Sequence, residues 1–225
     1  MEIGATIADY LDISEESIVA VIGCGGKTAL IERLIANFWD KKVLVSPTTK
    51  MYPRNVGGIR YIGKQNAQTG KLDALSEHEL AGLIPQYDIV LLEADGSRGL
   101  PCKGWNKDEP VIPGYCTHSI GVVTMNALGK AATTSIVHRL PEFLSLTGLR
   151  EGEPITMEAL TEMVCAPQGM FKNSIGIRIL LVNQVEDGQA ARSAKRFLRI
   201  IKEKYPEHFS KLLYGSVYQD SWWEV

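Results

Sequence analysis

The segment 18–28 contains the residue types that hold a polyphosphate. It reads Ile-Val-Ala-Val-Ile-Gly-Cys-Gly-Gly-Lys-Thr, so an apolar run passes directly into a glycine-rich turn that ends in Lys27 and Thr28. Glycine adopts positive φ without a steric cost, which lets successive backbone N–H groups turn toward one anion. Lys27 adds a mobile positive charge, and the Thr28 hydroxyl can bind a Mg²⁺ ion shared with the phosphates. We therefore expect a nucleotide-binding loop that consists of Gly23, Cys24, Gly25, Gly26, Lys27 and Thr28.

This loop departs from the standard phosphate-binding pattern, G-x-x-x-x-G-K-[ST]. The first glycine of that pattern falls on Val21, which belongs to the apolar run. The loop is therefore a compact variant, or it is only a glycine-rich turn between a strand and a helix. Cys24 also has two interpretations: the start of a helix favours a reactive thiolate, whereas a small side chain that fills the loop is the simpler one.

Two carboxylates, Glu93 and Asp95, follow the apolar run 89–92 at a spacing of two residues. Side chains alternate along a strand, so both carboxylates lie on the same face of its end. Ligands collect beyond the carboxyl ends of parallel strands, where the glycine loop also lies. We expect Asp95 to bind Mg²⁺ together with Thr28, and Glu93 or Asp95 to position or deprotonate a nucleophile, with Lys27 as the third catalytic residue. The alternative is a pair that only keeps the strand end soluble or caps a helix.

Polar residues after other predicted strands can complete the site. Thr48, Thr49 and Lys50 can contact phosphate oxygens or the metal, although a turn with a helix cap explains them equally well. Arg98 lies in a loop after a strand end. It can hold an anion there, unless it is a solvated surface charge.

Asn183 begins the segment Asn-Gln-Val-Glu-Asp, at a place where many guanine-nucleotide proteins carry Asn-Lys-x-Asp. Here Gln184 replaces the lysine that covers the base, and Glu186 replaces the aspartate that pairs with guanine. Asn183 is thus a candidate nucleotide ligand. The choice between ATP and GTP stays open.

Short apolar runs alternate with helical patterns along the chain. The runs are nearly continuous, as is typical of parallel strands that helices cover on both faces. The predicted strands are residues 18–22, 43–46, 89–94, 120–124, 177–182 and 212–217. The predicted helices are residues 30–38, 77–84, 157–164 and 190–204. We therefore predict an α/β fold of three layers with a mainly parallel central sheet.

Two stretches interrupt this alternation. Residues 96–118 are rich in Gly, Pro and polar residues, so we predict a long loop, and loops of that length are usually functional. Residues 138–176 predict a helical insertion between two strands. The sequence contains no linker or internal repeat that divides it, so we expect residues 1–225 to form a single domain.

The composition excludes several classes of protein. An apolar fraction of 45% is ordinary for a folded globular chain, and a net charge of −2 gives no attraction for nucleic acid. Four cysteines without C-x-x-C spacing predict free thiols rather than a zinc site or a disulfide framework. No apolar run approaches the roughly 20 residues that cross a bilayer. The N-terminus lacks the features of a secretion signal, so we expect a cytoplasmic protein without membrane contact.

A further signal comes from eight segments taken in order. They are residues 23–28, 48–51, 93–99, 101–103, 109–113, 127–130, 137–139 and 183–187. Together they resemble the YqeC family of selenium-dependent hydroxylase accessory proteins. The resemblance implies a P-loop NTPase-like fold and a role in maturing molybdenum hydroxylases that carry labile selenium, at their molybdopterin cofactor. It also implies phosphate and Mg²⁺ binding by Lys27 and Thr28, and it gives Asp95 the acidic position at the strand end.

The motifs and the resemblance predict a Mg²⁺-dependent NTP-binding protein, a slow NTPase that uses ATP or GTP and assists the maturation of selenium-dependent molybdenum hydroxylases. Its expected partners are the nucleoside triphosphate and a molybdenum hydroxylase or its pterin cofactor. One alternative is a small-molecule kinase in which Arg98, Lys103 and Arg139 bind an acceptor. The other is a non-catalytic scaffold that binds nucleotide or pterin and docks on a hydroxylase.

Overall fold

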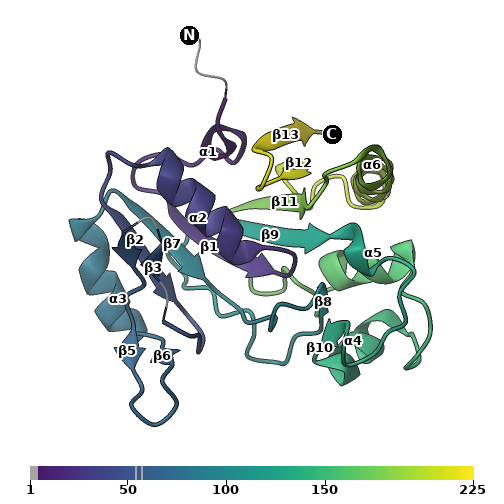
Figure 1. Ribbon diagram of the computed structural model, residues 1–225, viewed down its shortest axis with the longest axis horizontal. Helices are drawn as coiled ribbons and strands as arrows, with labels where there is room; N and C mark the ends of the chain where they lie inside the picture. Colours follow the sequence, from purple (N-terminus) through teal and green to yellow (C-terminus); the bar gives the residue numbers. More distant parts are fainter. Residues whose placement is uncertain (1–4, 54, 57) are drawn as a thin grey trace.

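A mainly parallel sheet of seven strands forms the centre of the protein (Figure 1). The computed structural model describes residues 5–53, 55–56 and 58–225. The strand order is β13-β12-β11-β9-β1-β7-β2. The strands are β1 (Ile18–Gly23), β2 (Val43–Pro47), β7 (Ile89–Glu93), β9 (His118–Thr124), β11 (Ile177–Asn183), β12 (Lys211–Ser216) and β13 (Ser221–Glu224). The six apolar runs of the sequence are the six parallel strands, which confirms the α/β prediction, and β13 adds an antiparallel strand at one edge.

The order of the strands places the loops after β1 and β7 side by side. The chain passes from β1 to β2, returns to β7 between them, and then crosses to β9 on the other side of β1. Val21 pairs in register with Glu93, while Gly23 pairs with Val122 of β9. The glycine loop therefore begins directly beside the carboxyl end of β7.

Helices cover both faces of the sheet, because successive side chains of the strands point to opposite faces. The helices are α1 (Ile7–Tyr10), α2 (Lys27–Asn37), α3 (Glu77–Leu83), α4 (Leu140–Thr147), α5 (Met157–Cys165) and α6 (Gly188–Lys204). Val19 and Val21 pack in one buried cluster with residues of α1 and α2, whereas Ala20 and Ile22 belong to a second cluster with residues of the other four helices. The predicted arrangement of helices on both sides of the sheet is thus confirmed.

Several short elements were not predicted from the sequence. Helix α1 has only four residues, too few for a helical period, and a capping box of Thr6 with Asp9 holds it. Two hairpins between β2 and α3 consist of two-residue strands: β3 (Asn55–Val56), β4 (Ile59–Arg60), β5 (Lys64–Gln65) and β6 (Leu72–Asp73). The predicted helical insertion contains α4 and α5, which pack against each other.

The chain between β7 and β9 has little regular structure, as expected for the predicted long loop. It contains only β8 (Cys102–Lys103), which pairs in parallel with β10 (Val137–His138). Strand β9 begins at His118, two residues before the predicted strand start at residue 120, so the loop ends at Thr117. In the described part of the chain, no helix is both long and apolar enough to cross a bilayer.

Candidate functional site

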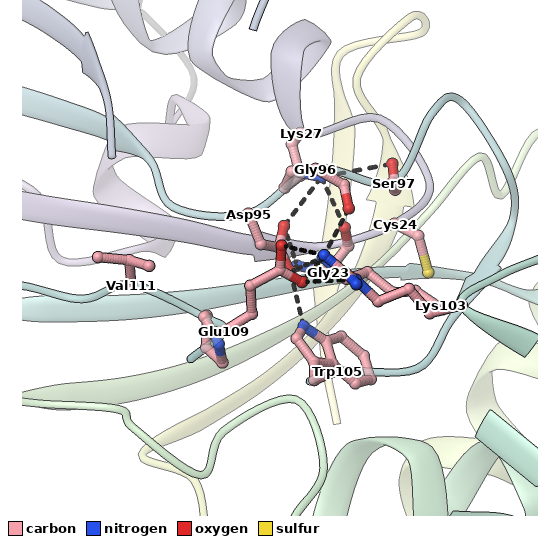
Figure 2. Close-up of polar contacts among 12 residues, drawn as sticks. Gly23, Cys24, Lys27, Asp95, Gly96, Ser97, Lys103, Trp105, Glu109 and Val111 are labelled. Atoms are coloured by element: carbon pink, nitrogen blue, oxygen red, sulfur yellow. Dashed lines mark hydrogen bonds and ion pairs between the residues drawn. The ribbon is translucent and has the colours of Figure 1, made fainter. Parts of the chain in front are cut away.

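A buried ion pair between Lys27 and Asp95 lies at the centre of the site (Figure 2). Lys27 Nζ is 3.1 Å from Asp95 Oδ1, and both side chains are almost fully removed from solvent. The same ammonium group donates a hydrogen bond to the Gly23 carbonyl at 2.6 Å and a longer one to Ser97 Oγ at 3.5 Å. The first residue of α2 and the second residue after β7 are thus joined directly, because β1 and β7 are neighbours in the sheet.

Lys27 is one of several groups that donate to the Asp95 carboxylate or lie beside it. The Gly23 N–H donates to both carboxylate oxygens at 3.1 and 3.2 Å, and the Trp105 indole Nε1–H donates to Oδ2 at 2.8 Å. Lys103 Nζ lies 3.5 Å from the same Oδ2. Burial by itself raises the pKa of Asp95, but the charges of Lys27 and Lys103 and the two N–H donors hold this pKa below its ordinary value. Asp95 is therefore a fixed anion.

The ion pair continues into a chain of alternating charges. Lys103 is fully buried, and its ammonium lies 2.9 Å from Glu109 Oε2 and donates to the Gly96 carbonyl at 2.6 Å. Glu109 in turn accepts two hydrogen bonds from the Arg139 guanidinium, at 2.9 and 3.1 Å. We call the sequence Lys27, Asp95, Lys103, Glu109 and Arg139 the ion chain.

From the sequence, Lys103 and Arg139 are cations that could bind an acceptor in the kinase alternative, and Glu109 has no assigned role. In the structure, Lys103 is enclosed between two carboxylates, and Arg139 is committed to Glu109. Trp105 was also overlooked. One signal could have drawn attention to Glu109 and Trp105: the segments 101–103 and 109–113 lie in a polar loop that follows a strand end.

The glycine loop has the backbone conformation that its sequence predicts. The φ angles of Gly23, Gly25 and Gly26 are 96°, 103° and 113°, in the region that side chains disfavour. A Cβ on Gly23 would collide with the Val122 carbonyl, so the loop also needs glycine for space. Asn183 braces the loop: its Nδ2 donates to the Gly25 carbonyl at 2.8 Å.

The start of α2 differs from that of most helices in this protein. Side-chain oxygens cap the backbone N–H groups of α1, α3, α5 and α6; they come from Thr6, Ser76, Thr156 and Asp187. Gly26 precedes α2 and supplies no side-chain acceptor. The first amides of α2 can therefore donate to an anion, and the helix dipole favours one there.

The carboxylate beside Thr28 is Glu93. Thr28 Oγ1 donates to Glu93 Oε2 at 3.3 Å, and Glu93 is only half-buried. Within residues 5–53, 55–56 and 58–225, no group of three or more His, Cys, Asp or Glu side chains forms a ready metal site. Mg²⁺ often has few protein ligands and takes the others from phosphates and water. This geometry favours Glu93 over Asp95 as the acidic partner of Thr28.

The other candidate ligands differ in how exposed their side chains are and in how close they lie to the glycine loop. Thr48 is close to the site, because its N–H donates to the Glu93 carbonyl at 3.0 Å, but its hydroxyl donates to the Val111 carbonyl. Thr49 is half-buried, and Lys50 is exposed and lies 3.6 Å from Asp73. Arg98 is exposed in the loop after Asp95.

Cys24 fills space in the loop. Its side chain is buried, and its Sγ donates to the Pro101 carbonyl at 3.0 Å. Burial raises the pKa of Cys24 to about 12, although Lys27 acts in the opposite direction. The thiol is therefore protonated at neutral pH, which supports the simpler interpretation of this residue. All four cysteines are free and buried, as predicted.

Replacement of Asp95 with Asn tests how strongly the ion chain stabilises the fold. It removes a counter-charge from buried Lys27 and Lys103, so we expect the free energy of unfolding at neutral pH to fall by about 3–5 kcal/mol. The folded pKa of Asp95 is lowered, so its contribution is present above the ordinary aspartate pKa of about 3.9 and is lost as the pH falls through the folded value. Urea unfolding from neutral to acidic pH measures both effects.

The matched control is Asp40→Asn, at a carboxylate that is 51% exposed. We expect it to change the free energy of unfolding by less than about 0.5 kcal/mol. The Asp95→Asn protein should also lose less stability in acid than the wild type. Equal losses in the two variants, or an unchanged acid dependence, would contradict the buried ion pair.

Thiol titration tests the state of Cys24. At about pH 8, near the ordinary cysteine pKa, we expect the native protein to react slowly with an aromatic disulfide reagent, because all four thiols are buried. In guanidinium chloride, four thiols per chain should react rapidly. A thiol in the native protein that reacts at once, and that Cys24→Ser removes, would show that Cys24 is an accessible thiolate.

Comparisons with known proteins identify the family of this chain. The family model described as "YqeC protein" matches residues 19–141, which include the glycine loop and the whole ion chain. "Uncharacterized protein YqeC" of Escherichia coli (strain K12) is 31% identical over 195 residues, which cover 75% of each chain. This chain therefore belongs to the YqeC family.

Proposed function

We propose that this protein is a Mg²⁺-dependent NTP-binding protein of the P-loop type and a slow NTPase. One observation carries the proposal: the Lys27 ammonium, the Thr28–Glu93 pair and the uncapped amides of α2 meet in one loop at the carboxyl end of a parallel sheet. A nucleoside triphosphate, ATP or GTP, needs this combination of cation, N–H donors and metal-binding oxygens.

Lys27 can exchange Asp95 for a phosphate without leaving an unpaired buried carboxylate. Asp95 keeps the Lys103 charge and the N–H donors of Gly23 and Trp105 when the lysine turns away. The lysine stem is flexible, so its ammonium can follow an anion that reaches the loop. Asp95 therefore holds the Lys27 ammonium at a place from which a phosphate can draw it away.

Thr28 and Glu93 are the residues of this chain that fit Mg²⁺. Both offer oxygen atoms, and their 3.3 Å contact places them side by side at the loop. When bound, the metal would neutralise phosphate charge. Glu93 is half-buried at the mouth of the loop, so it can also orient a water molecule for attack, whereas Asp95 is occupied by its own donors.

Asn183 contributes by fixing the loop. It bridges the Gly25 carbonyl and the Val217 N–H, which joins the glycine loop to the end of β12. Its side chain is thereby occupied, so we assign it a positioning role in nucleotide binding.

The kinase alternative needs free cations near the loop to bind an acceptor. Of the three named for that role, Lys103 and Arg139 are committed to carboxylates of the ion chain. This favours hydrolysis over transfer to an acceptor. The scaffold alternative differs from the proposal in one observable, because it predicts binding without turnover.

The proposed biological role is to assist the maturation of selenium-dependent molybdenum hydroxylases, with the hydroxylase or its pterin cofactor as partner. The support for this role is what the resemblance of the segments 93–99 and 109–113 to the YqeC family implies. Both segments belong to the loop that contains Asp95 and Glu109.

Calorimetric titration with Mg·ATP and Mg·GTP tests the nucleotide site. We expect Lys27→Ala to weaken binding at least about a hundredfold, or about 2.7 kcal/mol, because it removes the phosphate-binding charge. Thr28→Val should abolish the strengthening of binding by Mg²⁺. Lys41→Ala is the matched control, since Lys41 pairs with Glu15, and both residues precede the starts of parallel strands, at the edge of the sheet opposite the loop.

Release of inorganic phosphate is measured on the same proteins. Wild type and Lys41→Ala should release phosphate, while Glu93→Gln should bind Mg·NTP but hydrolyse it at least about tenfold more slowly, as expected for loss of one positioning group. If folded wild-type protein binds neither nucleotide, the proposal is wrong. Binding without phosphate release supports the scaffold instead.

Complementation tests the maturation role. In a strain that lacks this protein and contains a selenium-dependent hydroxylase, we expect hydroxylase activity to fall and the hydroxylase protein level to stay constant. Wild type and Lys41→Ala should restore the activity, and Lys27→Ala should not. Full hydroxylase activity without this protein would rule out the role.

A further inference from the structure

Helix α6 concentrates positive charge on its outer side. Its 17 residues include six basic side chains and one acidic side chain, which give the helix a net charge of +5. The whole chain has a net charge of −2, so the residues outside α6 have a net charge of −7. The six basic side chains are all exposed; they are Arg192, Lys195, Arg196, Arg199, Lys202 and Lys204.

Three of these side chains form a row, which we call the Arg row: Arg192, Arg196 and Arg199. Spacings of four and three residues place them on one side of the helix. The opposite side of α6 is apolar and lies in the core. The Arg row forms no ion pair within the described ranges of the chain, where the arginines that pair with a carboxylate are Arg33, Arg139 and Arg150.

A hollow of about 340 Å³ lies along the Arg row. Besides the three arginines it is lined by Lys195, Ile200 and Glu203. All of these residues belong to α6, which packs beside β12 near one edge of the sheet (Figure 1). The surface therefore presents several cations around one apolar side chain.

An exposed tryptophan extends this surface toward the edge of the sheet. The Trp223 ring stacks on Tyr214 with the ring centres 5.3 Å apart, and Lys195 Nζ lies 5.4 Å from the centre of the same Tyr214 ring. Trp223 remains 48% exposed. Tryptophan and arginine are enriched among the residues that contribute most to the stability of protein complexes.

Three classes of partner carry enough negative charge to bind here, and the surface favours a protein. A helix enters a membrane surface with its apolar side, but this side of α6 is in the core. A nucleic acid would be repelled by Glu203, which lies in line with the Arg row, and by the net charge of −7 on the rest of the chain. Guanidinium groups match the planar geometry of carboxylates, which favours an acidic protein surface.

We propose that the Arg row and its hollow bind a helix of a partner protein that carries Asp or Glu at every third or fourth position along one side. Carboxylates at this spacing match the Arg row, because both helices rise by about 1.5 Å per residue. An aliphatic side chain beside them would pack on Ile200. The surface contains no residue of the glycine loop, so the proposal depends neither on nucleotide binding nor on the maturation role.

Fluorescence anisotropy on the full chain tests the surface. The probe is a labelled, alanine-based peptide of about 18 residues, long enough to be partly helical, with Glu at every third or fourth position and Leu beside this row. We expect saturable binding of one peptide per chain. The affinity should fall at least about tenfold as the salt concentration rises from about 0.01 M to about 0.15 M, because the Debye length falls from about 30 Å to about 8 Å.

A second peptide tests whether the spacing of the carboxylates matters. It has the same composition, but its Glu residues are distributed around the helix. We expect its affinity to be at least about tenfold lower, because only part of its charge can face the Arg row. Equal affinities of the two peptides would overturn the proposed acidic helix.

Charge reversal gives a matched comparison. Arg192→Glu combined with Arg199→Glu should abolish binding of the acidic peptide. Lys42→Glu combined with Arg60→Glu changes the net charge equally, at exposed positions near β2, the opposite edge of the sheet. It should change the affinity by about twofold at most, because distant charges are screened.

The reversed charges also allow a rescue experiment. A peptide with Lys in place of Glu should bind the variant with Glu at positions 192 and 199, and it should not bind wild type. The proposal is overturned if wild type shows no saturable binding of the acidic peptide, or if the two double variants bind that peptide equally well.

Two further measurements identify other occupants. Duplex DNA of about 20 base pairs should bind wild type at least about tenfold more weakly than the acidic peptide does at the same salt concentration, and tighter binding of the DNA would overturn the choice of a protein. Sedimentation should give the same oligomeric state for wild type and for the Arg192→Glu, Arg199→Glu variant. A wild-type dimer that this variant dissociates would show that the occupant is a second copy of the chain, which would also overturn the proposal.

Discussion

The buried carboxylate of Asp95 is the constraint on which the site depends. A charge removed from water is tolerated only when opposite charges and hydrogen-bond donors surround it. Here Lys27, Lys103, Trp105 and the Gly23 N–H supply them. These four groups come from the glycine loop, from α2 and from the long loop after β7, so one side chain determines how three segments meet.

The same requirement orders a loop that has almost no regular structure. Lys103 needs Glu109 as well as Asp95, and Glu109 needs Arg139, so the ion chain runs from α2 through the loop to the start of α4. Backbone contacts reinforce it: the Val111 N–H donates to the Ala94 carbonyl at 3.0 Å. Because Asp95, Lys103 and Glu109 each contact two other members of the ion chain, removal of one of them affects its neighbours.

Asp95 has further partners that bear on the proposed recruitment of Lys27 by an anion. If a lysine were the only partner of a buried carboxylate, moving the lysine would be costly. The carboxylate would then be left as an unpaired buried charge. Asp95 retains three other donors or cations when Lys27 leaves. The proposed exchange of Asp95 for a phosphate therefore leaves no unpaired buried carboxylate.

The sequence by itself determined the six parallel strands and the conformation of the glycine loop. Continuous apolar runs such as Val19 to Ile22 predict parallel strands, because a strand that is buried on both faces does not alternate apolar with polar residues. The glycines before Lys27 predict a loop with positive φ. The two-residue strands were beyond prediction, since they contain no period that could be recognised.

Only the tertiary structure decided which charges are paired. Lys103 is 76 residues from Lys27 along the chain, and Arg139 is 30 residues from Glu109, so no local pattern relates them. The sheet order and the course of the long loop bring them together. Lys103 and Arg139, which the sequence suggests are surface cations, thereby become partners of carboxylates. Residue spacing reports local geometry, whereas the pairing of buried charges depends on how distant segments pack, and for that reason the roles of Asp95, Lys103 and Glu109 became visible only in the fold.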